Sequence, residues 1–528
     1  MTKRNNTDAY PAEEDSNRAG DSRQVRMSLR VYNTLSRQKE LFATVHPGKV
    51  GMYLCGPTVY TSPHIGHMVG PIVFDTFKRY LKYKGYDVTW VVNITDVDDK
   101  LIDAAAAQKV TVQELADKYT AEYLDCLGRF GIDSIDRFPK ASDHMAEIIE
   151  MTQRLIDTGF AYLAGGTVWF EVAKDPDYGK LSNRKVEDQE AGTRQLEGAG
   201  KKSSADFALW KGAKPGEPAW DSPWGKGRPG WHIECSAMSR KYLGDTMDIH
   251  GGGMDLMFPH HENELAQSES ANAKPLAKFW MHNGLTRIRT KMAAGEWAQE
   301  KMSRSLGNVV SARELLDIHG SELLRYMLLS THYRRPIEFT DEVLSNSRKA
   351  LLVFSRLIER IERLTGKPLP EDAPDMDHAA AKLLESEVGP FARQVLGEKM
   401  RFLEMMDDDF NTAGAIAVMH DLAGSVNSFL EQNRAEANRQ PDVLEAASAA
   451  SQTLRSLGRL LGLFRPGLPR PASQEPALVE QLMQLLIEIR NQARQTKNFP
   501  LADAVRNGLK NAGITLEDRP EGTGWRKE

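Results

Sequence analysis

The chain has 528 residues, too many for one hydrophobic core, and its length predicts about three or four domains. Its 68 Lys and Arg against 73 Asp and Glu give a net charge of −5, which excludes a broadly basic nucleic-acid-binding surface but permits a local basic face. Only three cysteines, and no apolar run near the ~20 residues of a membrane span, predict a cytoplasmic protein without disulfides or membrane contact.

The N-terminal part is predicted to be a disordered extension followed by an α/β sheet. Residues 1–26 have no apolar core for a signal peptide, and their acidic residues count against a transit peptide. The runs VGMYLCG and DVTWVVNI then predict buried strands, and GPIVFDTFKRYLKYKG between them predicts a helix that ends on Gly85. Strand, helix and strand at this spacing indicate a Rossmann-like parallel sheet, whose first half we place at residues 27–138.

The middle of the chain has a different composition. Gly, Pro and Trp crowd LWKGAKPGEPAWDSPWGKGRPGW, which predicts loops and turns held by buried indoles. We therefore place an insertion at residues 139–231 and the second half of the sheet domain at residues 232–290. The next stretch, residues 291–345, contains the cationic loop KMSRSLGN.

The last third of the chain is predicted to be helical. Apolar residues recur at intervals of three and four after Asp341, and predict a helical bundle over residues 346–465. These positions are Leu351, Leu352, Phe354, Leu357, Ile358, Ile361 and Leu364. A Pro-rich linker is expected at residues 466–476, followed by a small C-terminal domain at residues 477–528.

Common nucleotide and hydrolase signatures are absent from the sequence. The chain has no GxxxxGK[ST] motif, no GxGxxG motif after the first predicted strand, and no GxSxG motif. P-loop, Rossmann dehydrogenase and α/β-hydrolase interpretations therefore lose support.

The stretch HGGGMDLMFPHHENELAQSE, residues 250–269, concentrates imidazoles and carboxylates. His260 and Glu264 are four residues apart, so a helix places both on one face. The HExxH motif of zinc proteases does not fit, because Leu265 stands four residues after His261.

Two cysteines are candidate partners for this pair. Cys55 ends the first predicted strand, and Cys235 lies in WHIECSAM; we expect both at strand ends, where α/β active sites lie. Together with His260 and Glu264 they would make a four-ligand zinc set. The alternative is a pair of core thiols beside a solvated polar face. Cys126, in YLDCLGRFGI, is predicted to be a buried and inert helix residue.

Two further motifs suit nucleotide chemistry. PHIGH, residues 63–67, is predicted in a strand-to-helix loop, where free N–H groups and two histidines can bind phosphate. KMSRSLGN, residues 301–308, is a cationic loop. Each alone is compatible with an ordinary surface loop, whereas both in this order on an α/β chain are far more specific.

These motifs carry a family resemblance. PHIGH resembles the HIGH motif, and KMSRS the KMSKS motif, of class I aminoacyl-tRNA synthetases. MYLCGPTVY, NITDVDDK, DFALWKGAKPGEPAWDSPWGKGRPGWHIECSAM and DIHGGGMDLMFPHHENE, together with KMSRSLGN, resemble the cysteinyl-tRNA synthetase family from about Leu29 to Trp525. The resemblance implies activation of L-cysteine by ATP, with Mg²⁺, to cysteinyl-AMP and pyrophosphate, and transfer of cysteine to the 3′-terminal adenosine of tRNA(Cys). We expect a monomer.

The resemblance also implies a metal site. Cys55, Cys235, His260 and Glu264 match the family's zinc ligands one by one, while His261 and Glu262 receive no ligand role. Zinc would select the substrate thiolate, because an alkyl hydroxyl gives up its proton far less readily.

Roles around ATP and cysteine follow from the same resemblance. His64 and His67 would contact the phosphates, and Lys301 would stabilise the leaving pyrophosphate. Arg304 would also bind ATP; it stands where the family usually has a second Lys and replaces a compact ammonium with a planar fork. The polar stretch RIRTKMAAGEWAQE before Lys301 is longer than expected. The predicted pocket for cysteine and adenosine is lined by Thr95, Trp231, His250 and Asp255.

The C-terminal domain resembles the family's anticodon-binding segment. The predicted base contacts are Arg494, Phe499, Asp503 and Asp518. Phe499 stands where a Trp is expected, and either ring can stack on a base, although core packing is the alternative.

Two other functions compete with this interpretation. A mycothiol-type cysteine ligase would share the zinc and adenylation site but join cysteine to an amino sugar, and that relative lacks a full anticodon module. A non-catalytic, zinc-bearing RNA-binding module would not need PHIGH or Lys301.

Overall fold

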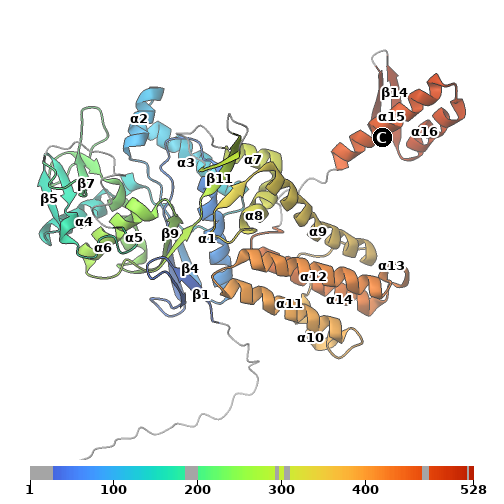
Figure 1. Ribbon diagram of the computed structural model, residues 1–528, viewed down its shortest axis with the longest axis horizontal. Coiled ribbons are helices and arrows are strands. Elements are labelled where there is room, and N and C mark those ends of the chain that lie inside the picture. Colours follow the sequence, from blue (N-terminus) through green and yellow to red (C-terminus); the bar gives the residue numbers. More distant parts are fainter. Residues whose placement is uncertain are drawn as a thin grey trace, which may run out of the picture.

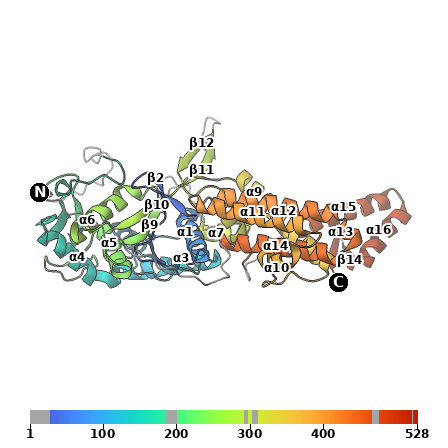
Figure 2. The same cartoon turned by 90° about the horizontal axis from the view of Figure 1, so that it is seen from below.

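The computed structural model describes residues 28–184, 200–291, 297–301, 310–465, 475–519 and 522–527. The predicted N-terminal extension, most of the predicted linker and Arg304 lie outside these ranges. Figure 1 shows a mixed α/β region joined to a bundle of long helices, and Figure 2 shows a β-hairpin that projects from the body. None of the described helices combines the length and the apolarity needed to cross a bilayer.

A four-stranded parallel sheet organises the α/β region, which confirms the predicted fold class. Its strand order is β10-β9-β3-β4. The strands are β3 (Lys49–Leu54), β4 (Asp87–Val92), β9 (Met247–Gly253) and β10 (Ala277–Asn283). The predicted strands VGMYLCG and DVTWVVNI are β3 and β4. The predicted helix between them is α1 (Ile65–Tyr83), and the chain turns at Gly85 with φ of 92°.

Further elements flank the sheet. Helices α2 (Asp99–Gln108) and α3 (Val112–Arg129) follow β4, and a capping box of Thr111 and Glu114 begins α3. Cys126 lies on α3 and is 1% exposed, as predicted. The hairpin of β1 (Arg30–Asn33) and β2 (Gln38–Leu41) precedes β3, and Asn33 bonds the backbone of Lys278 and Trp280 in β10.

The insertion contains more regular structure than its composition predicts. Turn η1 (Ala141–His144) and helix α4 (Met145–Asp157) precede a four-stranded antiparallel sheet in the order β5-β6-β7-β8. Its strands are β5 (Ala161–Ala164), β6 (Thr167–Phe170), β7 (Phe207–Gly212) and β8 (Gly227–Pro229), with turn η2 (Val172–Lys174) after β6. Trp210 is fully buried, as predicted. The prediction that this stretch consists of loops and turns was wrong, because β7 and β8 lie inside it.

Two helices connect the insertion back to the sheet. Helix α5 (Trp231–Leu243) precedes β9; turn η4 (Met257–His261) and helix α6 (Glu262–Asn272) follow β9. Cys235 lies on α5, so its predicted place at a strand end was wrong. The reason is that α5 buries seven consecutive residues, Ile233 to Ser239, and therefore shows no amphipathic period.

A small three-stranded sheet lies between the sheet domain and the bundle. It has the order β12-β11-β13 and contains the hairpin that projects in Figure 2. The strands are β11 (Thr286–Lys291), β12 (Trp297–Lys301) and β13 (Ile337–Phe339), with α7 (Ala312–His319) and α8 (Ser321–Leu329) before β13. Arg325 of α8 pairs with Asp75 of α1, and its Nε donates to the Leu461 carbonyl at 2.7 Å, so a buried cation ties the domains together.

The predicted helical bundle follows β13. Its helices are α9 (Asp341–Thr365), α10 (Met376–Leu383), α11 (Gly389–Asp407), α12 (Thr412–Gln432), α13 (Ala435–Asn438) and α14 (Pro441–Leu460). The predicted apolar positions of α9 are buried, apart from the half-buried Leu352.

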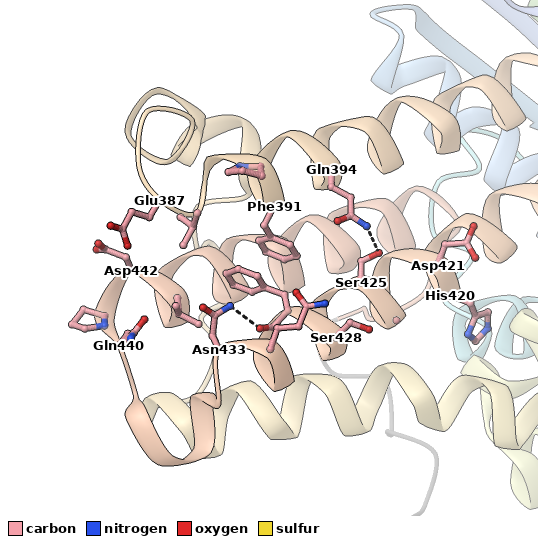
Figure 3. Close-up of a pocket in the computed structure, with 17 residues that line it drawn as sticks. Glu387, Phe391, Gln394, His420, Asp421, Ser425, Ser428, Asn433, Gln440 and Asp442 are labelled. Atoms are coloured by element: carbon pink, nitrogen blue, oxygen red, sulfur yellow. Dashed lines mark hydrogen bonds between the residues drawn. The ribbon is translucent and has the colours of Figure 1, made fainter.

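A groove of about 1120 Å³ opens between α11 and α12 (Figure 3). Phe391 and Phe429, both in its lining, stack on each other with ring centroids 3.8 Å apart. Glu387, Asp421 and Asp442 line it, and its described lining includes no Lys or Arg. That charge makes the groove a poor site for a nucleic-acid backbone.

The described C-terminal elements are a helix pair and a hairpin, which stand apart from the bundle in Figure 1. They are α15 (Glu475–Gln495), α16 (Phe499–Asn511), β14 (Ile514–Arg519) and β15 (Gly522–Lys527). Helices α15 and α16 pack together, and β14 packs on α16. The domain boundaries given above stay predictions.

Candidate active site and metal centre

The predicted site residues gather at the carboxyl edge of the parallel sheet. Cys55 directly follows β3, and Thr95 lies two residues after Asn93 at the end of β4. The two segments pair there, because Val59 donates to the Thr95 carbonyl and Thr95 donates to the Pro57 carbonyl, both at 3.2 Å. This edge is where open parallel sheets bind ligands.

The structure brings Cys55, Cys235, His260 and Glu264 together, and their donor atoms lie within 4.8 Å of one another. The two Sγ atoms are 3.7 Å apart, and Cys235 Sγ lies 3.6 Å from His260 Nε2. Tetrahedral zinc, with about 2.3 Å to sulfur and about 2.0 Å to nitrogen, requires about 3.8 Å and about 3.5 Å for these separations. His260 Nε2 and Glu264 Oε1 are closer, at 2.8 Å, the distance of a charge-assisted hydrogen bond. The donor set therefore fits a zinc ion.

The ionisation states of these donor side chains depend strongly on one another. Burial alone would lower the pKa of His260, but the Glu264 carboxylate and then Cys235 raise it to about 10. Burial likewise opposes ionisation of Cys235, yet its hydrogen bonds with Cys55 and His260 bring the pKa to about 7. Burial would also raise the pKa of Glu264, but His260 and His250 hold it well below its usual range. Glu264 and Cys235 thus tend towards the ionised forms that bind metal. The raised pKa of His260, and that of Cys55, which burial and then Cys235 raise, favour protons that a metal ion would displace.

Further histidines surround the four donors. His232 Nδ1 lies 3.0 Å from His260 Nδ1, and Gln267 donates to the His232 carbonyl at 2.6 Å. His250 Nε2 lies 2.7 Å from Glu264 Oε2. Such partners fix the orientation of metal-binding side chains.

His261 is the main residue that the sequence interpretation missed. Its Nε2 lies 3.3 Å from Cys55 Sγ and its Nδ1 lies 2.8 Å from His282 Nε2. It forms a second group of possible metal donors with Cys55, His250 and Glu264. No spacing signal marks it, because its contact with Cys55 joins residues 206 positions apart in the chain.

The predicted cysteine and adenosine pocket is partly assembled. The Trp231 ring stacks on His260 with centroids 4.1 Å apart, while His250 is fully buried in β9. Thr95 is buried and its hydroxyl accepts from Asn93 at 3.2 Å. Asp255 is exposed in the turn after β9, beside Gly253.

PHIGH forms the N-terminus of α1. His64 caps the helix, its Nδ1 accepting from the Gly66 amide at 3.1 Å, and its ring stacks on His67 with centroids 3.8 Å apart. Any side chain at Gly66 would lie only 2.9 Å from the His64 ring, so glycine keeps the two imidazoles packed here. Both histidines are half-buried at the N-terminus of α1, where the partial positive charge of the helix suits phosphate. The amides of Ile65, Gly66 and His67 already have acceptors, so the two imidazoles are the side chains placed to contact it.

The flanks of the KMSRS loop meet this helix end. Ile65 donates to the Val310 carbonyl at 3.2 Å, and Ala312 donates to the Pro63 carbonyl at 3.1 Å. On the other flank, Lys301 ends β12 and pairs with Arg287 of β11. The backbone therefore anchors Val310, two residues after the loop, directly beside PHIGH. The ATP-binding role predicted for Arg304 lies outside the described residues.

The predicted anticodon contacts fall on the C-terminal elements. Arg494 is exposed near the end of α15, and Asp503 is exposed on α16. Phe499 begins α16 with 58% of its surface exposed, which removes the core-packing alternative. Asp518 lies in β14. Base contact by these residues stays a prediction.

Comparison with known proteins adds independent findings. A family model for the class I (C) tRNA synthetase catalytic domain matches residues 41–349, and one for the DALR domain matches residues 401–465. The cysteine–tRNA ligase of Heliobacterium modesticaldum is 46% identical over 505 residues, covering 95% of this chain and 100% of that protein. The cysteine–tRNA ligase of Geobacter sulfurreducens is 45% identical over 508 residues, with the same coverage.

A solved structure shares the fold. It is Mycobacterium tuberculosis methionyl-tRNA synthetase in complex with methionyl-adenylate, with a TM-score of 0.56 and 17% identity. The match covers 86% of this chain and 96% of that one. At this identity the likeness concerns the fold alone.

Proposed function

This chain belongs to the cysteine–tRNA ligase family of class I aminoacyl-tRNA synthetases, and we propose that its four buried donors select cysteine by holding a zinc ion. The enzyme joins L-cysteine to AMP with release of pyrophosphate, and then transfers the cysteinyl group to the 3′-terminal adenosine of tRNA(Cys). The names of its relatives favour this activity over the mycothiol-type alternative.

Cys55, Cys235, His260 and Glu264 would hold the ion. When bound, zinc would supply a borderline-soft Lewis acid that takes a thiolate far more readily than a hydroxyl. Size or apolarity alone would separate cysteine from serine by only about 1–3 kcal/mol. The observation that carries the proposal is the pair of donor separations, 3.7 Å and 3.6 Å, that match tetrahedral zinc.

The neighbouring side chains would hold these donors in place. His232 fixes the ring orientation of His260 through its Nδ1 contact, and Trp231 covers the opposite face of the site by stacking on that ring. His250 occupies the second oxygen of Glu264, so Oε1 is left to the metal. Thr95, from the neighbouring strand end, would line the cysteine pocket.

The nucleotide would lie at the N-terminus of α1, with Mg²⁺ neutralising its phosphates. His64 and His67 would donate hydrogen bonds to the α-phosphate as the cysteine carboxylate attacks it. Lys301 and Arg304 would stabilise the charge on the departing pyrophosphate. Anchoring of Val310 beside PHIGH supports this arrangement, because it fixes one end of the KMSRS loop at the helix end.

tRNA would bind through the C-terminal elements as well as at the active site. Arg494, Phe499, Asp503 and Asp518 would contact anticodon bases, with the exposed Phe499 ring stacking on one of them. Phe499→Ala should then weaken tRNA binding by roughly 1–3 kcal/mol while pyrophosphate exchange stays unchanged. A monomer in the cytoplasm is the expected form.

Cysteine-dependent ATP–pyrophosphate exchange, followed by charging of tRNA(Cys), tests the proposed reaction. Exchange with cysteine and not with serine, together with charging, is the expected result. Exchange without charging would favour the mycothiol-type alternative. Absence of both activities would favour a non-catalytic RNA-binding module.

Cobalt substitution tests the role of the metal separately. A thiolate-to-metal charge-transfer band should grow when cysteine is added to the cobalt protein and should stay unchanged with serine. If cysteine at saturation leaves the spectrum unaltered, the ion is structural and the selectivity has another origin.

A further inference from the structure

The helical bundle carries a row of cations that the reaction described above does not use. Lys349, Arg356 and Arg363 are all exposed on α9. They recur at intervals of seven residues, so they lie along one line of the helix with a drift of only about 20° per step. The buried Leu351 and Ile358 each follow a member of the row by two residues, which places the row on the side of α9 away from the core. We call these three cations the α9 stripe; at about 1.5 Å per residue it is about 21 Å long.

The α9 stripe has no acidic partner within the described part of the chain. Arg360, on the same side of the helix, shows the contrast. It pairs with Glu436 at 2.7 Å, and its Nη1 donates to Asn427 at 2.7 Å, so it ties α9 to α12 and α13. Arg360 is also four residues after Arg356 and three before Arg363, and like charges at these spacings destabilise a helix. The stripe therefore does not contribute to folding through ion pairs.

A groove of about 360 Å³ lies beside the α9 stripe, between α9 and α12. Arg356, Arg360 and Arg363 line it. Glu359 is the one acid in its described lining, and within the described bundle it forms no ion pair with the arginines on either side of it. Positive charge therefore dominates this side of the bundle.

The other side of the bundle has the opposite charge. Helix α12 packs against both α9 and α11, and Figure 1 shows α9 along the upper edge of the bundle and α11 along the lower edge. The groove between α11 and α12 is lined by Glu387, Asp421 and Asp442, and its described lining includes no Lys or Arg. In a chain with a net charge of −5, an approaching polyanion is thus repelled by that groove and attracted to the α9 edge.

The α9 stripe lies between the two regions that the proposed function assigns to tRNA. Helix α9 begins at Asp341, just after β13, and β13 pairs with β11 of the sheet in which β12 ends at Lys301. From there α9 runs along the edge of the bundle that faces α15 and α16 in Figure 1. A tRNA with its 3′ end in the active site and its anticodon at the C-terminal elements passes along this edge.

We propose that the α9 stripe binds the phosphate backbone of tRNA between its acceptor end and its anticodon. The inference rests on the proposed function, because it takes tRNA as the partner. Exposed cations in a line suit the phosphates of an RNA stem, which proteins recognise mainly by shape and backbone charge. Phosphate contacts fix the register of a nucleic acid and do not read its sequence. The stripe positions any tRNA, and the choice of tRNA(Cys) is left to base contacts elsewhere.

The test measures Kd for tRNA(Cys) and for a non-cognate tRNA at several salt concentrations, with the full-length enzyme. The variant carries Lys349→Gln, Arg356→Gln and Arg363→Gln together. Its slope of log K against log salt should be shallower by about 3, about one for each lost phosphate contact. Both tRNAs should bind roughly 10- to 100-fold more weakly at low salt. Because the three positions are exposed and Gln is a good helix former, the melting temperature and tRNA-independent pyrophosphate exchange should be unchanged.

Three further variants serve as controls. Arg393→Gln removes an exposed arginine of α11 and should leave the salt slope unchanged. The charge-conserving combination of Lys349→Arg, Arg356→Lys and Arg363→Lys should restore the wild-type slope. Glu359→Gln removes the acid beside the stripe and should tighten binding of both tRNAs, a change that a purely structural role would not produce.

Two results would overturn the inference. The first is a triple Gln variant with the same salt slope as Arg393→Gln. The second is self-association of the wild type at low salt, measured by sedimentation, that the triple Gln variant loses while its tRNA slope stays normal; the stripe would then dock into the acidic groove of a second copy. If the wild type neither exchanged pyrophosphate nor charged tRNA(Cys), the proposed function would fall as well. Normal charging by the wild type, with an unaltered slope in the triple Gln variant, would reject only this inference.

Discussion

The two ends of the active site are built differently. At the amino-acid end, side chains from β3, α5 and the η4–α6 segment converge, and the cluster is buried apart from the half-buried Cys55. At the nucleotide end, the half-buried His64 and His67 stand at a helix N-terminus that is held to residues 310–312 by backbone hydrogen bonds. The amino-acid end depends on donor chemistry, and the nucleotide end depends on backbone position and charge.

This difference predicts how each end responds to substitution. A change of donor at the amino-acid end removes part of the set that would hold the metal and bind the substrate thiolate. At the nucleotide end the positive end of the α1 dipole remains whatever the side chain, so loss of one charge should lower the rate and leave binding largely intact.

The largest effect is expected for Cys235→Ala. Loss of a thiolate ligand should abolish stoichiometric zinc binding and reduce cysteine-dependent exchange below detection. Cys126→Ala is the matched control, because Cys126 is equally buried but lies on α3 away from the cluster. Metal analysis and exchange assays of both variants provide the measurement. Full zinc content in Cys235→Ala would disprove the ligand assignment.

Lys301→Ala should have the next largest effect, at the other end. Charge on the leaving pyrophosphate develops in the transition state, so one oriented donor is worth on the order of 3 kcal/mol in the chemical step. Single-turnover formation of cysteinyl-AMP should slow by roughly 100-fold while the Kd for cysteine changes little. Arg304→Lys should be mild. Normal single-turnover activation in Lys301→Ala would remove its catalytic role.

His232→Ala should produce a smaller change, again at the amino-acid end. His232 orients His260 without being one of the four donors, and loss of such a partner costs about 10–100-fold in metal affinity. Competition with a chelator measures that affinity directly. An unchanged affinity would mean that the Nδ1 contact does not hold the His260 ring.

The sequence predicts these two ends unequally well. The pair His260 and Glu264 could be placed together because residues four apart share one face of a helix, and in the structure His260 in η4 and Glu264 at the start of α6 do so. Cys235 was placed on a strand because α5 is buried all round and lacks a helical period. The motif PHIGH indicated a helix N-terminus, since a strand and an amphipathic helix flank it.

Residues that reach the site only through tertiary contacts have no recognisable signal in the sequence. His232 and His261 reach the cluster only after α5 and the η4–α6 segment pack together. The strands of the insertion were not predicted because they are short and interrupted by Gly and Pro. By contrast, the bundle was predictable because its helices are amphipathic over many turns.

The smallest effect on activity is expected at Asp99, which links α2 to the insertion at the edge of the amino-acid end. Its carboxylate pairs with Lys211 at 2.7 Å and with Arg228 at 2.5 Å. Burial alone would raise the pKa of Asp99, but Lys211 and then Arg228 lower it to about 2. Because the pKa in the unfolded chain is about 3.9, the stabilisation is complete above that value and is lost as the pH falls towards 2.

Asp99→Asn should therefore lower the unfolding free energy by about 1–2 kcal/mol at pH 7, allowing for partial exposure of the pair, while exchange activity stays within about twofold. The difference in unfolding free energy between wild type and variant should narrow as the pH falls from about 5 to about 3, because protonation of Asp99 in the wild type removes the same charge. Urea unfolding midpoints measured across this pH range give the difference. Asp103→Asn is the control, because Asp103 is an exposed acid on the same helix. A gap that stayed constant with pH would show that packing, and not the ion pairs, makes Asp99 stabilising.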